Sequence, residues 1–177
     1  MNLNLSDSDN RQNGLSIENE FLAPASVFRE YDIRGLANSE ITDGFAKCLG
    51  LALGEFALSR NQQTFFVGRD ARLSSPSLAE SLCTGLESAG CHVLSLGEVT
   101  TPILNFAIDR DLSCKSGVMV TASHNAAAYN GFKIIIGGEV ISGRELQKLK
   151  SALKPNGFPF KTSTPRITKD IISQYSQ

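Results

Sequence analysis

Residues 117–125 read Gly117-Val118-Met119-Val120-Thr121-Ala122-Ser123-His124-Asn125. The apolar run at 117–120 predicts a buried strand, and this run stops abruptly at a hydroxyl, an imidazole and an amide. A turn signal at 130–131 then precedes a second apolar run at 132–136, which carries Lys133. We therefore expect a nucleophile-type hydroxyl at a strand end, with a cation returning nearby on the next strand.

Strand and helix patterns alternate on both sides of this segment. Residues 64–67 and 92–96 are typical of strands, and between them Leu78, Leu82 and Leu86 recur at helical spacing. Such alternation predicts an α/β fold, a three-layer αβα domain with a mixed, mostly parallel sheet.

Further elements are indicated by local signals. Residues 27–35 have a strand-like core, and Thr42 offers an N-cap to a following helix. Gly137-Gly138 is typical of a hairpin, and a last helix is expected over about 143–153. Residues 167–175 resemble the start of a further helix.

Length and composition bound the organisation of the chain. The 177 residues carry a net charge of −1 and are 41% hydrophobic, which suits one domain with a real core. We predict a polar, mobile tail at 1–24, a domain at 25–160, and a linker or helix start at 161–177 that leads to a second domain. The charge gives no support for nucleic acid as a partner, and no apolar run is long enough for a membrane span.

The cysteines and histidines exclude some kinds of site. Cys48, Cys83, Cys91 and Cys114 form no CxxC pair, so buried free thiols in a reducing cytoplasm are expected. The sequence contains two histidines, which excludes a multi-histidine metal site.

Several polar residues follow directly after predicted strands. In α/β sheets, ligands bind outside the carboxyl ends of strands, so Arg34, Arg69, Thr101 and Ser123 could gather on one rim. Arg34 has two readings, a surface arginine paired with Asp32 or Glu30, or a phosphate clamp.

The loop residues between these strands also have plainer readings. Asp70 is expected to fix Arg69 or Arg72 within its own loop, and Asn130-Gly131 is expected to form a plain turn. Neither motif alone indicates a catalytic role.

Ser123 itself has three readings. It could be a helix or turn cap, a phosphoryl carrier or a hydrolase nucleophile. A phosphoserine carries close to −2 charge and needs cations around it, a role that suits Lys133 and Arg34. The hydrolase reading fails because His124 is adjacent in sequence and the chain has no GxSxG elbow.

Over about residues 25–153 the chain resembles the first domain of the α-D-phosphohexomutases, most closely the bacterial phosphomannomutase/phosphoglucomutase branch. The resemblance rests on motifs that occur in this order: Phe28-Arg29-Glu30-Tyr31-Asp32-Ile33-Arg34-Gly35, Val67-Gly68-Arg69-Asp70, Gly97 with Thr101-Pro102, Thr121-Ala122-Ser123-His124-Asn125, and Tyr129-Asn130-Gly131-Phe132-Lys133.

The resemblance implies a mechanism. The serine at position 123 would be phosphorylated and would interconvert hexose 1-phosphate and hexose 6-phosphate through a bisphosphorylated sugar. Mg²⁺ would bind a phosphoserine oxygen, and a hexose bisphosphate would act as activator. Arg34, His124 and Lys133 would assist proton transfer or stabilise the transferring group, while Tyr31 and Asn125 would contact the sugar substrate.

Two departures from the family pattern qualify these expectations. Ala126-Ala127-Ala128 stands where the family usually has proline, so we expect a more mobile loop. No DGDXD metal loop occurs, so the remaining metal ligands and the sugar specificity are expected from further domains of the same enzyme, without which this domain would be inactive. Two alternatives stay open, a non-catalytic phosphosugar-binding or interaction domain and the first domain of a phosphoglucosamine mutase.

Overall fold

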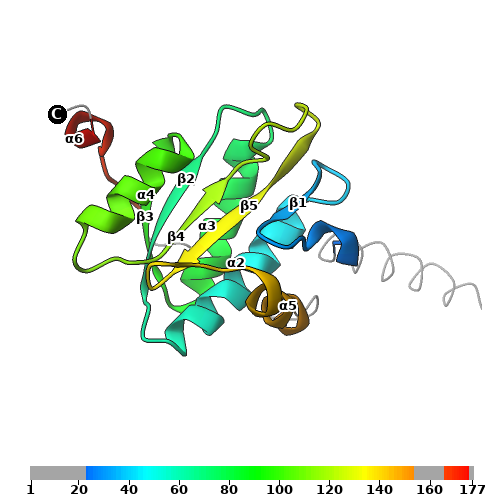
Figure 1. The fold of residues 1–177 in the computed structure, drawn as a ribbon, viewed down its shortest axis with the longest axis horizontal. Helices are drawn as coiled ribbons and strands as arrows, with labels where there is room; N and C mark the ends of the chain where they lie inside the picture. Colours follow the sequence, from blue (N-terminus) through cyan, green and yellow to red (C-terminus); the bar gives the residue numbers. More distant parts are fainter. Residues whose placement is uncertain (1–22, 154–165, 176–177) are drawn as a thin grey trace, which may run out of the picture.

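The computed structural model of the chain describes residues 23–153 and 166–175. One mixed sheet lies between helices on its two faces, in the three-layer arrangement seen in Figure 1. The predicted α/β class with a mixed sheet is confirmed. The predicted polar tail at 1–24 lies almost entirely outside the described residues.

The elements follow one another along the chain in an alternating order. They are η1 (Ala25–Val27), β1 (Ile33–Leu36), α2 (Asp43–Leu58), β2 (Thr64–Arg69), α3 (Ser75–Ala89), β3 (His92–Glu98), α4 (Thr101–Arg110), β4 (Gly117–Val120), β5 (Tyr129–Ile136), β6 (Glu139–Val140), α5 (Gly143–Ala152), β7 (Ile167–Thr168) and α6 (Ile172–Tyr175). None of the described helices combines the length and apolarity that crossing a bilayer requires.

The sheet has a parallel half and an antiparallel half. The strand order is β1-β5-β4-β2-β3-β7, and β6 pairs with β5. Strands β4, β2, β3 and β7 run parallel, whereas β5 is antiparallel to its neighbours β1, β4 and β6. The expected hairpin at Gly137-Gly138 joins β5 to β6, and both glycines have the positive φ that such a turn needs.

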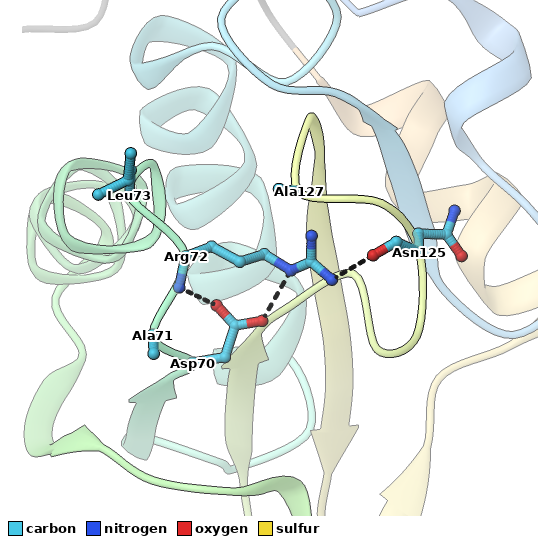
Figure 2. A pocket seen from close by; sticks show the side chains of 6 residues that line it. All are labelled: Asp70, Ala71, Arg72, Leu73, Asn125 and Ala127. Carbon is cyan, nitrogen blue, oxygen red and sulfur yellow. Dashed lines mark hydrogen bonds and ion pairs between the residues drawn. The ribbon is translucent and has the colours of Figure 1, made fainter.

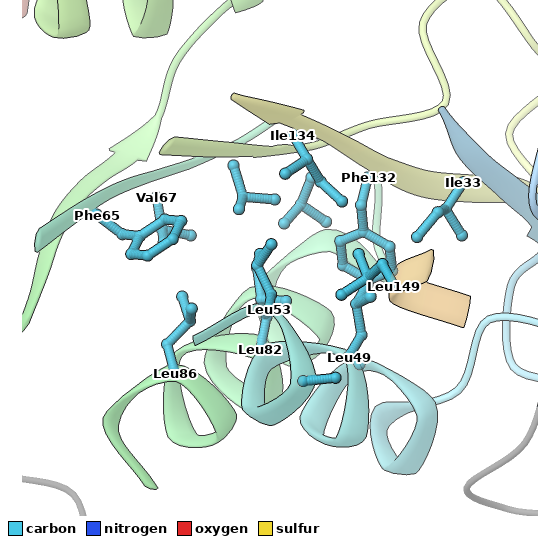
Figure 3. Packing of buried hydrophobic residues seen from close by; sticks show 14 of the residues in the cluster. Ile33, Leu49, Leu53, Phe65, Val67, Leu82, Leu86, Phe132, Ile134 and Leu149 are labelled. Carbon is cyan, nitrogen blue, oxygen red and sulfur yellow. The ribbon is translucent and has the colours of Figure 1, made fainter. Parts of the chain in front are cut away.

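Two apolar clusters hold the layers together. Helices α2, α3 and α5 cover one face of the sheet, where Leu53, Leu82 and Leu86 point toward Phe65 and other strand residues (Figure 3). The opposite face carries a smaller cluster under α4. Both clusters contain residues of β2 and β4. Close packing of these strands holds the start of the loop that follows each of them in a fixed position.

Helices α2 and α3 approach each other through two glycines. A Cβ on Gly50 would lie 2.1 Å from the carbonyl oxygen of Leu82, and a Cβ on Gly85 would lie 2.1 Å from the carbonyl oxygen of Lys47. Contact of this kind between two backbones leaves no room for a side chain. The two glycines therefore set the distance between the helices.

The C-terminal region differs from its predicted helix start. Residues Ile167–Thr168 form β7 beside β3, and the short helix α6 begins only at Ile172. Arg166 forms ion pairs with Glu80 and Glu87 on α3, and Ile171 is buried. The difference has a physical reason, because β3 offers an open backbone edge that a local sequence pattern does not reveal.

The four cysteines are free and buried, as the sequence predicts. Burial raises the pKa of the Cys83 thiol to about 12 and that of Cys91 to about 11. Both thiols therefore stay protonated at neutral pH, which makes them poor nucleophiles.

Replacement of Gly85 by alanine tests the glycine contact. The added methyl group must push α3 away from α2, so we expect a loss of about 2–3 kcal/mol of unfolding free energy and a fall in Tm of roughly 5–10 °C. Thermal denaturation followed by circular dichroism measures both. Ser77→Ala, at an exposed position of the same helix, is the control, and equal stability of the two variants would contradict the close approach.

Candidate functional site

Ser123 lies in the loop that follows β4, at the carboxyl end of the parallel strands. Ser123, His124 and Lys133 line one cavity of about 740 Å³. The start of α4, including Thr101, lines the same cavity. The expected hydroxyl at a strand end therefore does share a cavity with a cation from the next strand.

The backbone of Ser123 is held in an unusual conformation. Its φ is 55°, in the left-handed region that side chains other than glycine seldom adopt. The amide of Ser123 donates a 2.9 Å hydrogen bond to Oγ1 of Thr121. This bond helps to offset a conformational cost of roughly 1–3 kcal/mol, and such strain is common where a reactive side chain is presented.

Asp70 connects this turn to the neighbouring loop and to α3. Its carboxylate accepts hydrogen bonds from the hydroxyls of Thr121 and Ser75 and from the backbone amide and Nε of Arg72. Burial raises the pKa of the Asp70 carboxyl, but these hydrogen bonds and the charge of Arg72 outweigh it, so the pKa lies below its ordinary value. The stabilisation is therefore present above about pH 4 and is lost as the pH falls through the lowered pKa.

Arg72 holds the serine loop by its backbone. Its guanidinium donates to the carbonyl oxygens of Ser123, Asn125, Ala126 and Tyr129, at distances of 2.7–3.1 Å. Figure 2 shows Arg72 between Asp70 on one side and the loop of Asn125 and Ala127 on the other. The expectation that Asp70 fixes Arg69 or Arg72 is confirmed for Arg72, and the arginine in turn braces the segment that contains Ala126-Ala127-Ala128.

A second polar cluster lies on β1 and β5. Asp32, which directly precedes β1, is 7% exposed. Its carboxylate accepts a hydrogen bond from Nη2 of Arg34 and lies 3.4 Å from Nζ of Lys133. Nη1 of Arg34 donates a 2.8 Å hydrogen bond to Oδ1 of Asn125. Arg34 thus links Asp32 to the serine loop, so the structure contains the carboxylate pairing of the first reading, and the phosphate clamp stays a prediction.

The remaining predicted residues are placed as follows. Tyr31 is 68% exposed and precedes Asp32, so it is not packed in the core. Arg69 forms an ion pair with Glu98, which lines the cavity of Ser123, but Arg69 itself lines a different pocket. The expected rim is therefore built by Ser123 and Thr101, with Arg34 joined to it through Asn125.

The expectation of a plain turn at Asn130-Gly131 is wrong. Both residues lie within β5 and pair with β1. A Cβ on Gly131 would lie 2.0 Å from the carbonyl oxygen of Ile33, which explains the glycine. Asn130 is fully buried and donates to the hydroxyls of Ser74 and Ser75, so it extends the hydrogen-bond network of Asp70 into the sheet.

Replacement of Arg72 by lysine tests the bracing of the serine loop. An ammonium group cannot reach four carbonyl oxygens as the guanidinium fork does. We expect amide hydrogen exchange across residues 123–129 to accelerate roughly tenfold or more, with α2 unchanged. Hydrogen-exchange mass spectrometry measures this, Arg69→Lys is the control, and unchanged exchange in the loop would contradict the bracing role.

Comparison with known proteins agrees with this geometry. Residues 25–159 match the family model described as phosphoglucomutase/phosphomannomutase, alpha/beta/alpha domain I. A Pseudomonas aeruginosa phosphomannomutase/phosphoglucomutase is 44% identical over 133 residues, which cover 75% of this chain and 28% of that protein. A phosphoglucomutase of Neisseria gonorrhoeae is 39% identical over 84% of this chain and 32% of its own length. The chain thus spans about a third or less of these curated relatives.

Solved structures give the same assignment. A phosphoglucomutase/phosphomannomutase family protein from Burkholderia thailandensis superposes with a TM-score of 0.77 at 32% identity, covering 87% of this chain and 35% of that one. A putative phosphomannomutase from Thermus thermophilus gives 0.74 at 30% identity, covering 84% and 34%. The match of fold, motif order and sequence shows that this chain belongs to the phosphoglucomutase/phosphomannomutase family, of which it contains domain I.

Proposed function

We propose that this chain carries the phosphoryl-bearing serine of a phosphohexomutase, an isomerase that interconverts hexose 1-phosphate and hexose 6-phosphate. The observation that carries the proposal is the presentation of Ser123 in a left-handed backbone conformation on a cavity that it shares with His124 and Lys133. A plain turn cap needs neither a shared cavity nor a loop braced through Asp70 and Arg72.

The proposed reaction has two phosphoryl transfers. In the first, the bond between phosphorus and Oγ of Ser123 breaks, and phosphorus bonds to a free hydroxyl oxygen of the hexose phosphate. The proton of that hydroxyl ends on Oγ of Ser123. In the second transfer, the other phosphate of the bisphosphorylated sugar returns to Ser123, and its former sugar oxygen takes the proton. A hexose bisphosphate would supply the first phosphate to an unmodified serine.

The neighbouring side chains suit the charges of these steps. Phosphoryl transfer depends on positioning and on compensation of negative charge, which Lys133 and Arg34 would supply. His124, exposed beside Ser123, is the candidate for moving the proton. Asn125 and Tyr31 are the candidates for contact with the sugar.

A magnesium ion fits this scheme through the phosphoserine. Among the described residues, no group of three or more histidine, cysteine or carboxylate side chains lies close enough to hold a metal. We propose that one oxygen of phosphorylated Ser123 is the ligand from this domain and that further ligands come from the part of the enzyme that corresponds to the remaining length of its relatives. Bound there, Mg²⁺ would neutralise charge on the transferring phosphate.

The substrate class is proposed as hexose phosphates. The names of the relatives include phosphomannomutase/phosphoglucomutase and, at 36% identity in Methanosarcina acetivorans, probable phosphoglucosamine mutase. Hexosamine phosphates therefore remain the alternative within the class. The four free, buried cysteines support a reducing compartment such as the cytoplasm for the proposed enzyme.

A chimaeric enzyme tests the proposed function. Residues 25–153 of this chain would replace the matching part of the Pseudomonas aeruginosa relative. We expect Mg²⁺-dependent turnover of glucose 1-phosphate and mannose 1-phosphate, and a loss of roughly 10⁴-fold in turnover on Ser123→Ala. A coupled assay measures turnover, glucosamine 1-phosphate tests the alternative substrate, and Ser77→Ala is the control.

Phosphopeptide mass spectrometry of the same chimaera separates the mutase from a non-catalytic domain. After incubation with glucose 1,6-bisphosphate we expect phosphate on Ser123. A folded chimaera without phosphoserine would favour the interaction domain, and full turnover by the Ser123→Ala variant would refute the proposed role of the serine.

A further inference from the structure

Asp32 is a carboxylate shared by the two cations of the proposed phosphate site. It is 7% exposed and contacts both Arg34 and Lys133. One negative charge between two positive ones leaves a net charge of +1 in this cluster. An anion arriving at the cluster therefore meets cations that already have a partner.

The sheet register places the three side chains together. Ile33 on β1 lies opposite Phe132 on β5. Lys133 directly follows Phe132 on β5, and Asp32 directly precedes β1, so the Asp32 carboxylate lies within 3.4 Å of Nζ of Lys133. Arg34 lies on β1 opposite Gly131 and also contacts Asp32. The pairing of β1 with β5 thus brings the two cations to the carboxylate that precedes β1.

The two cations differ in how firmly Asp32 holds them. Arg34 is the more enclosed, with 16% of its side chain exposed, and it is bound to both Asp32 and Asn125. Lys133 has 33% of its side chain exposed, lies at the longer distance of 3.4 Å and lines the cavity of Ser123. Lys133 can therefore turn from Asp32 to an anion in this cavity while Arg34 stays in place.

We propose that Asp32 is a positioning residue that competes with the phosphate on Ser123 for Lys133 and so limits how tightly that phosphate is held. The inference rests on the proposed function, because it assigns the anion in the cavity as a phosphate. A phosphoryl carrier must release its group in every cycle, and tight binding of the ground state does not accelerate such a transfer. Asp32 holds Lys133 in position between phosphoryl transfers. During a transfer, it weakens the interaction of Lys133 with the phosphate.

Replacement of Asp32 by asparagine tests the competition in the 177-residue chain. Asparagine keeps the size of the side chain and an acceptor for Arg34, but it frees Lys133. We expect the dissociation constant for inorganic phosphate, measured at pH 8 by isothermal titration calorimetry, to fall roughly three- to tenfold, as expected for one charge a few ångströms away. The same variant loses thermal stability, because two cations lose their shared carboxylate.

Two further variants make the result specific. Asp109→Asn removes the same charge from an exposed position of α4 and leaves phosphate affinity unchanged. In a Lys133→Met background, Asp32→Asn gives no gain, because the competition passes through Lys133. A merely structural role of Asp32 cannot produce tighter binding, so equal or weaker binding by Asp32→Asn, or a gain that persists without Lys133, overturns the proposal.

A measurement on the unmodified chain covers the case in which Asp32→Asn fails to fold. Phosphate is titrated while the ¹³C signal of the Asp32 carboxyl is followed by NMR. We expect the chemical shift of this signal to change with phosphate concentration as Lys133 leaves Asp32, and the change should give the same dissociation constant as calorimetry. A chemical shift that does not change overturns the proposal. Failure of the proposed function is seen separately, as absence of phosphate on Ser123 in the chimaera.

Discussion

The carboxylate of Asp70 is the interaction on which the serine site depends. It stands where β2 ends, and it receives hydrogen bonds from Thr121 after β4, from Ser75 at the start of α3 and from Arg72 in its own loop. Three separate segments are thereby tied to one charge. Because these hydrogen bonds lower the pKa of the Asp70 carboxyl, the group is ionised and the network is intact at neutral pH.

Two partners of the Asp70 carboxylate in turn hold the backbone around Ser123. Arg72, oriented by Asp70, binds four carbonyl oxygens of the following loop, and Thr121 binds the amide of Ser123. Backbone groups held in this way do not depend on the side chains of Ala126 or its neighbours. This explains how a loop with alanine at positions 126–128 keeps Ser123 at a positive φ, while the sheet register independently brings Arg34 and Lys133 to the same side.

The sequence correctly predicts the strands, helix caps and turns that are determined by residues close together in the chain. A buried strand ending at Ser123, the helix cap at Thr42 and the hairpin at Gly137 were all readable from spacing and turn chemistry. The turn prediction at Asn130-Gly131 is wrong because pairing of β5 with β1 overrides the local turn preference of an Asn-Gly pair. The bracing role of Arg72 has no sequence signature, since its partners are carbonyl oxygens more than fifty positions away.

In the proposed reaction Ser123 carries the phosphoryl group during turnover. This can be measured by rapid quench, with the chimaera labelled with ³²P at Ser123 and mixed with excess glucose 1-phosphate. If Ser123 is the carrier, the label leaves Ser123 and enters hexose bisphosphate within one turnover, at least as fast as steady-state catalysis. Label that remains on Ser123 while product accumulates would contradict it.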